Sequence, residues 1–162
     1  MITIRKGKLD DLELILDMLR CGRDYMRQNG NYYQWEDMER NRRKIIEDTT
    51  AGTSYMIYND DELVGVFTLC IGIDPTYVHI DGKWLDDSEY GTIHRIASNG
   101  KIGGIFKIAL EFSLTKIKHL RVDTHRRNKP FKKLLLANGF KRTGIITIDE
   151  GTHRDAYELI VK

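Results

Sequence analysis

The most informative part of the chain lies between residues 92 and 123, which read TIHRIASNGKIGGIFKIALEFSLTKIKHLRVD. The first six residues, Thr92–Ala97, predict a β-strand. A loop with three glycines follows, and apolar residues at helical spacing then predict a helix that begins at this loop. The stretch Leu120–Asp123 predicts another short strand. The unit is therefore strand, glycine loop, helix and strand.

The glycine loop predicts a phosphate site. Gly100, Gly103 and Gly104 let the backbone approach a ligand closely, because no Cβ intervenes. The helix that follows offers unpaired N–H groups and the positive end of its dipole to a pyrophosphate, and Lys101 adds a charge. A glycine-rich turn is often only a tight connection, so the loop alone is a weak motif. The loop has neither the G-K-[ST] of a Walker loop nor the G-x-G-x-x-G of a dinucleotide-binding fold.

The rest of the chain alternates strands and helices around this unit. Upstream, the pattern predicts a strand at residues 2–5, helices at 12–30 and about 36–48, and a hairpin of 55–58 with 63–69. Downstream, Asn128 is a plausible helix N-cap, with Pro130 in the first turn and Gly139 at the C-terminal end. The chain then closes with a hairpin of 145–148 and 156–161 around Asp149-Glu150-Gly151. This order predicts an α/β fold: a mixed sheet of six to seven strands with helices on both faces.

Composition limits the class of protein. The 162 residues, 41% hydrophobic and 31% charged, fit one domain spanning residues 1–162. No window approaches the ~18 consecutive apolar residues of a membrane span, and the N-terminus is not a signal peptide. Cys21 and Cys70 have no C-x-x-C spacing and lie in apolar-periodic segments, so we expect two small hydrophobes in a reducing cytoplasm.

Charge is balanced overall but concentrated locally. The net charge is +2, and we find no nucleic-acid reader motif, so nucleic acid is not an expected partner. Ten basic residues lie between Lys116 and Lys133, and this run predicts either a patch for phosphates or a solvated surface.

Two motifs resemble those of the GNAT superfamily of acyl-CoA N-acyltransferases. The family's loop [RQ]-x-x-G-x-[GA] reads KIGGIF at residues 101–106, and its N-x-x-A-x-x-L-Y-x-x-x-G-F reads NKPFKKLLLANGF at residues 128–140. The stretches IHRIAS, RVDTH and NKP resemble a bacterial subgroup of this superfamily. The order of elements also agrees along essentially the whole chain.

The resemblance implies an N-acetyltransferase with acetyl-CoA as co-substrate and no metal. The acetyl group would pass to the amine of a small molecule, an amino acid or a peptide. In the family, the cofactor-binding positions correspond here to Arg95, Ile96 and Ala97 for the pantetheine arm, Lys101, Ile102, Gly103, Gly104 and Ile105 for the pyrophosphate, and Asn128 and Phe131. Asn128 also suits a cap alone, because asparagine is a preferred N-cap. The fold often supports dimers, so a homodimer is an expected assembly.

Three residues depart from the family pattern. Lys101 replaces Arg or Gln, which keeps the charge but loses the guanidinium fork. Phe106 stands where Gly or Ala normally lets the pyrophosphate approach the helix. Leu135 replaces the tyrosine often taken as the acid that protonates the leaving thiolate. These departures leave open a non-catalytic domain that binds CoA or a protein partner, and an unrelated phosphate-binding module.

Catalysis needs a group that removes a proton from the amine. His94 lies in the predicted strand beside the expected thioester, and histidine titrates in the useful range. Tyr90 and Asp123 are further candidates for acid and base. We expect Tyr33, Trp35 and Trp84 to contact the acceptor, although aromatic residues in loops also serve to anchor those loops on the core.

Overall fold

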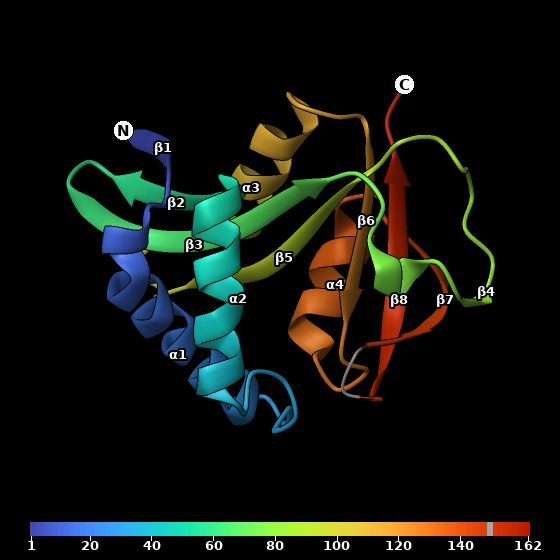
Figure 1. Ribbon diagram of the computed structural model, residues 1–162, viewed down its shortest axis with the longest axis horizontal. Coiled ribbons are helices and arrows are strands. Elements are labelled where there is room, and N and C mark those ends of the chain that lie inside the picture. Colours follow the sequence, from blue (N-terminus) through green and yellow to red (C-terminus); the bar gives the residue numbers. More distant parts are fainter. Residues whose placement is uncertain (149–150) are drawn as a thin grey trace.

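The computed structural model describes residues 1–148 and 151–162. The helices are α1 (Leu12–Gln28), α2 (Met38–Ala51), α3 (Ile105–Leu114) and α4 (Lys129–Ala137). The strands are β1 (Ile2–Lys6), β2 (Ser54–Asn59), β3 (Glu62–Ile71), β4 (Asp81–Gly82), β5 (Gly91–Ser98), β6 (His119–Thr124), β7 (Lys141–Thr147) and β8 (His153–Ile160). The elements follow one another in the predicted order (Figure 1).

The described residues form one eight-stranded sheet in the order β1-β2-β3-β5-β6-β8-β7-β4. Its neighbours run antiparallel except β5 and β6, which are parallel. The mixed sheet is confirmed, whereas the expected number of six to seven strands was one or two too low. The missed strand, β4, pairs with β7 over Asp81 and Gly82 only, and two residues are too few to show an alternating pattern.

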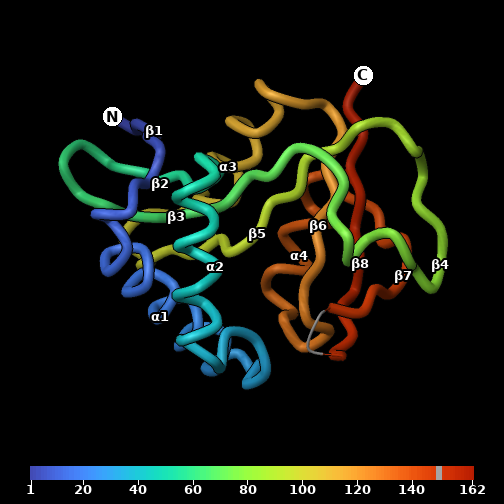
Figure 2. Tube along the Cα trace, viewed as in Figure 1, coloured from blue at the N-terminus to red at the C-terminus, as the bar shows by residue number. Residues whose placement is uncertain are grey.

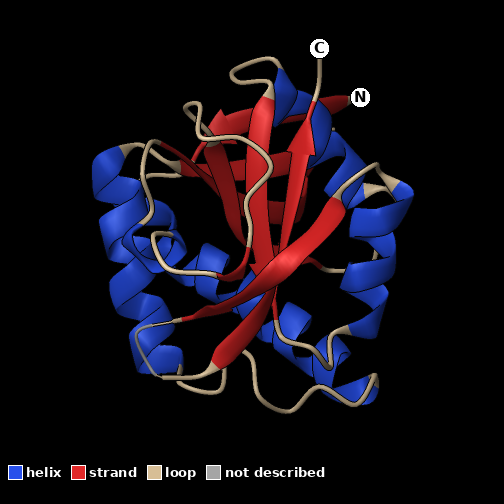
Figure 3. Ribbon diagram, turned by 90° about the vertical axis from the view of Figure 1, so that its right-hand side faces the viewer, coloured by secondary structure: helices blue, strands red, loops and turns tan. Residues whose placement is uncertain are grey.

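Helices cover both faces of the sheet, as Figure 3 shows. Because neighbouring residues of a strand point to opposite faces, Met56 and Val66 pack with α1 and α2, while Ile57 and Phe67 pack in the cluster that contains α3 and α4 residues. Each face therefore has its own apolar core, and the sheet is held rigidly between them.

Strand β5 has one free edge. It pairs with β6 only at Gly91↔Leu120 and Thr92↔Arg121, after which the two strands diverge (Figures 1 and 2). On its other edge β5 continues to pair with β3, but the register shifts near Arg95, which has a φ of 48°. The divergence leaves the backbone of residues 93–98 without a β6 partner.

Local sequence signals explain where the helices begin and end. The side chain of Asp37 accepts hydrogen bonds from the N–H groups of Glu39 and Arg40, so α2 begins after it and not at Glu36. The predicted cap of α4 is confirmed, because the Asn128 side chain accepts from the Phe131 N–H. Gly139, with a φ of 90°, follows the end of α4. In the last hairpin, Asp149 and Glu150 lie outside the described residues.

The structure also bears on two expectations from composition, which concern the cysteines and membrane-spanning helices. Cys21 is exposed rather than a packed hydrophobe, while Cys70 is half-buried. Among the described residues, no helix is both long and apolar enough to cross a membrane.

Candidate active site

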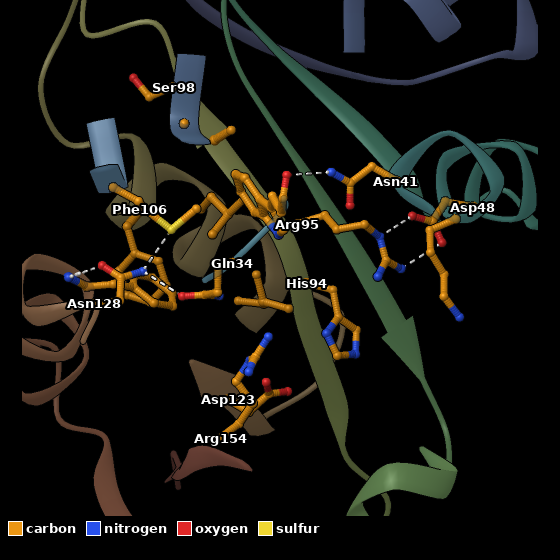
Figure 4. Close-up of a pocket in the computed structure, with 18 of the residues that line it drawn as sticks. Gln34, Asn41, Asp48, His94, Arg95, Ser98, Phe106, Asp123, Asn128 and Arg154 are labelled. Carbon is orange, nitrogen blue, oxygen red and sulfur yellow. Dashed lines mark hydrogen bonds and ion pairs between the residues drawn. The ribbon is translucent and has the colours of Figure 1, made fainter. Parts of the chain in front are cut away.

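A cavity of about 980 Å³ lies where β5 and β6 separate. Its walls come from α1, the α1–α2 loop, α2, β5, the glycine loop and α4 (Figure 4). The predicted residues that line it are His94, Asp123, Arg95, Ile96, Ala97, Ile102, Gly103, Gly104, Ile105, Asn128, Phe131, Tyr33 and Trp35. Three predicted residues do not line it: Tyr90, Trp84 and Lys101. The fold thus brings together most of the residues predicted from the sequence.

The glycine loop forms one end of the cavity. Gly100 and Gly104 have positive φ values of 76° and 77°, which glycine adopts without steric cost. A Cβ at Gly100, Gly103 or Gly104 would meet no atom within 4 Å, so this loop has open space beside its backbone. Helix α3 begins at Ile105 without a side-chain cap, which leaves its first N–H groups for a ligand.

The two apolar departures from the family pattern, Phe106 and Leu135, both pack in the core. Phe106 is buried, and its ring packs edge-to-face on Phe131 and against Phe140. Phe106 thus belongs to the core and also lines the cavity (Figure 4). Leu135 is fully buried in the same core and does not line the cavity, so its position supplies no acid here.

At the other end of the cavity, two hydrogen-bonded pairs face the gap between the strands. His94 Nε2 lies 2.9 Å from Asp74 Oδ2, and the Tyr77 hydroxyl donates to Asp123 Oδ2 at 2.6 Å. Tyr90 is buried, and its hydroxyl accepts from the Asp74 N–H at 2.8 Å. Tyr90 therefore supports the site instead of facing it.

Asp74 is ionised over the physiological range. Its burial raises the pKa, but hydrogen bonds from His94 and from Thr76 outweigh burial and lower the pKa to about 2. No sequence motif pointed to Asp74. The available signal was its position before Pro75, where its side chain caps the 3-10 helix Pro75–Tyr77.

This lowered pKa predicts an acid-dependent loss of stability. A carboxyl whose folded pKa lies below its ordinary 3.8 stabilises the fold above that value, and the contribution is lost as the pH falls toward 2. Chemical denaturation at pH 4 and pH 2 should therefore show a larger loss for the wild type than for Asp74→Asn. Parallel losses for the two proteins would contradict the assignment.

A second ion pair holds the irregular part of β5. Arg95 donates to Asp48 through Nε at 2.7 Å and through Nη2 at 2.9 Å, and the Thr68 hydroxyl donates to the same carboxylate at 2.7 Å. Asp48 is buried at the C-terminal end of α2. The pair therefore ties α2 to the residue with positive φ within the open edge (Figure 4).

The α1–α2 loop crosses the cavity and contacts the β6–α4 loop. Gln34 Oε1 accepts from the Thr124 hydroxyl and from the His125 N–H, both at 3.2 Å, and from Asn128 Nδ2 at 3.3 Å. The Tyr33 ring stacks on His125 at 5.1 Å between centroids. These contacts close one side of the cavity and occupy the Asn128 amide, so its cap role is established while its ligand role stays a prediction.

The structure corrects the prediction that Trp84 contacts the acceptor and excludes a continuous surface patch for the basic run. Trp84 lies away from the cavity: its Nε1–H donates to the Tyr77 carbonyl, and its ring packs on the Arg121 guanidinium. The basic run is not a continuous surface patch, because His119, Arg121 and His125 are buried. Arg121 and His119 instead bind the buried carboxylate of Glu158. No group of residues that could hold a metal occurs in the described ranges 1–148 and 151–162.

The chain is similar to solved structures, although comparisons with family models and curated proteins find no match. A GNAT-family acetyltransferase from Streptococcus agalactiae 2603 is 28% identical with a TM-score of 0.84, covering 99% of this chain and 96% of its own. PaiA N-acetyltransferase from Thermoplasma acidophilum, solved with coenzyme A, is 17% identical with a TM-score of 0.67, covering 99% of both chains.

The protein has the GNAT fold. A third structure of this fold is FeeM, an N-acyl amino acid synthase from uncultured soil microbes, which is 13% identical with a TM-score of 0.62 and covers 99% of this chain and 91% of its own. Acyl transfer is the general activity that these GNAT neighbours support. The match to a bacterial subgroup, the acceptor and the oligomeric state remain expectations.

Proposed function

We propose that this protein is an acetyl-CoA-dependent N-acetyltransferase that acts on the amine of a small molecule, an amino acid or a peptide. The observation that carries the proposal is the free edge of β5 at residues 93–98, next to a glycine loop and inside one continuous cavity. An extended amide-containing ligand adds to such an edge as an extra strand would. The pantetheine arm of coenzyme A has this character.

The residues present fit coenzyme A at both ends of its path. Ile102, Gly103, Gly104 and Ile105 would hold the pyrophosphate through backbone N–H groups, where the loop leaves open space. The backbone of residues 95–97 would align the pantetheine along β5. Bound there, coenzyme A supplies the activated acyl group as a thioester.

Side chains of the protein would then bind the amine and remove its proton. His94 lies beside the free edge and would accept the proton that the amine loses. Asp123, held by Tyr77, is a carboxylate that would attract the amine in its ammonium form. With Leu135 buried in the core, water is the proposed proton donor to the thiolate. Alignment of the two reactants would supply much of the rate.

A charge placed in the glycine loop should weaken coenzyme A binding selectively. Gly103→Asp adds an anion where a Cβ meets no atom within 4 Å and where φ is not positive. At about 4 Å in a high-dielectric surface site, repulsion between like charges is roughly 1–4 kcal/mol, so the Kd should rise about 10-fold or more. Calorimetric titration measures this, with Gly103→Ala as the matched control. If the two variants bound coenzyme A with equal affinity, pyrophosphate binding at this loop would be contradicted.

The function itself is tested by a thermal-shift titration with acetyl-CoA, followed by thiol release over a panel of amines. A ligand at 100 times its Kd adds about 2.7 kcal/mol to the free energy of unfolding. A shift with thiol release supports the transferase. A shift without release for every amine in the panel supports a non-catalytic CoA-binding domain, and no shift at millimolar ligand overturns both.

A further inference from the structure

We infer that Asp74 is a positioning residue for catalysis: its carboxylate keeps the neutral His94 ring in the form that carries the proton on Nε2. This inference rests on the proposed function, because it assigns His94 as the proton acceptor. It adds a residue from the β3–β5 connection that neither the motifs nor the comparisons identify.

The distance between the two side chains sets the protonation. Asp74 Oδ2 lies 2.9 Å from His94 Nε2, and an ionised carboxylate only accepts hydrogen bonds. The proton of a neutral His94 therefore lies on Nε2, and Nδ1 keeps its lone pair. Nδ1 is then the nitrogen that takes a proton from the amine, and the resulting imidazolium is stabilised by the negative charge of Asp74.

The carboxylate of Asp74 is held before any ligand arrives. Its Oδ1 accepts from both the N–H and the hydroxyl of Thr76, and its own N–H donates to the buried Tyr90 hydroxyl. A carboxylate fixed in this way has little freedom to leave His94. Such preorganisation distinguishes it from a surface carboxylate that happens to lie near a histidine.

The short turn that Asp74 begins also contacts β6, the strand on the other side of the gap. Asp74 precedes the 3-10 helix Pro75–Tyr77, and Tyr77, fully buried, donates its hydroxyl to Asp123 on β6. Burial, with the nearby Asp123 charge, raises the Tyr77 pKa well above its ordinary value, so this hydroxyl remains a donor. The turn thus fixes one polar side chain on each of the two diverging strands. Both of these side chains, His94 and Asp123, line the cavity.

The chemistry is balanced by groups already named. The amine nitrogen forms a bond to the thioester carbonyl carbon, the carbon–sulfur bond breaks, and coenzyme A leaves as the thiol. The neutral amine gives one proton to His94 Nδ1, and water gives one proton to the thiolate. The imidazolium then returns its proton to the hydroxide left by that water, and an acceptor that arrives as ammonium first releases one proton to the solvent. No oxidant, reductant or metal is required.

The test combines kinetics with nitrogen NMR of the whole protein. Asp74→Asn keeps the size of the side chain and a good capping residue but removes the charge. We expect kcat to fall by up to about 10⁴-fold, the loss seen when an orienting carboxylate becomes an amide and the histidine takes the wrong tautomer, with the KM for acetyl-CoA changed less than about twofold. Asp87→Asn, in the exposed loop before β5, is the control and should leave both constants unchanged.

Long-range ¹⁵N–¹H spectra of the wild type over a pH series read the protonation of His94 directly, with His94→Gln identifying its signals. For the neutral ring, the inference predicts a protonated Nε2 and an unprotonated Nδ1 in the free protein, and this measurement needs no activity and no variant at Asp74. A neutral ring with its proton on Nδ1, or an unchanged kcat in a folded Asp74→Asn, overturns it. If the spectrum fits but the wild type releases no thiol with any amine, the proposed function fails and the catalytic role of Asp74 fails with it.

Discussion

Replacing His94 by glutamine lowers kcat for acetyl transfer by about 10²- to 10⁴-fold, the range expected when a general base is lost. Glutamine is similar in size and can still hydrogen-bond to Asp74, but it cannot accept the proton of the amine. The measurement is steady-state thiol release at saturating acetyl-CoA and acceptor. Binding of acetyl-CoA should stay within about twofold of the wild type, because the ligand contacts proposed for β5 are made by backbone groups.

Two outcomes would contradict the role of His94. An unchanged kcat would leave proton removal to Asp123 or to water. A large rise in the Kd for acetyl-CoA, with kcat preserved, would make His94 a binding residue. After an unchanged kcat, Asp123→Asn distinguishes Asp123 from water as the proton acceptor. A fall in the kcat of Asp123→Asn would assign proton removal to Asp123.

The second large effect concerns the ion pair at the irregular part of β5. Asp48→Ala leaves the Arg95 guanidinium without its carboxylate in a poorly solvated position. Breaking a buried pair from one side costs about 3–5 kcal/mol of unfolding free energy. Chemical denaturation followed by circular dichroism measures this loss.

An exposed ion pair provides the control. Glu13→Ala removes the partner of Arg42 at 2.6 Å on the surface, where such pairs contribute little. The double variant Asp48→Ala with Arg95→Ala should recover part of the loss, because the uncompensated charge is removed. An Asp48→Ala protein as stable as Glu13→Ala would show that the bidentate pair does not hold β5.

Much of the architecture could be predicted from local chemistry. The apolar segments of β2 and β3, the asparagine cap with Pro130 in α4, and the glycine after it are all short-range signals, and each element appears where expected. The glycine loop and the strand before it both line the cavity. Strand β4 was not predicted, because its two residues are too few to show an alternating pattern.

The site was predicted less completely because its partners are distant in sequence. Asp74 meets His94 across 20 residues, and Asp48 meets Arg95 across 47, distances at which a pattern gives no guidance. Phe106 departs from the motif, and its ring packs on Phe131 and Phe140 while the residue also lines the cavity. Trp84 looked like a substrate contact, but the buried Arg121 provides the surface on which it packs.

The central claim is that coenzyme A binds along the free edge of β5. Hydrogen–deuterium exchange with and without acetyl-CoA tests it most directly, because backbone N–H groups of this edge and of the glycine loop would become hydrogen-bonded. The account predicts slower exchange within residues 93–98 and 102–105, with the far edge strand β1 unchanged. Protection confined to other segments, or none at saturating ligand, would contradict it.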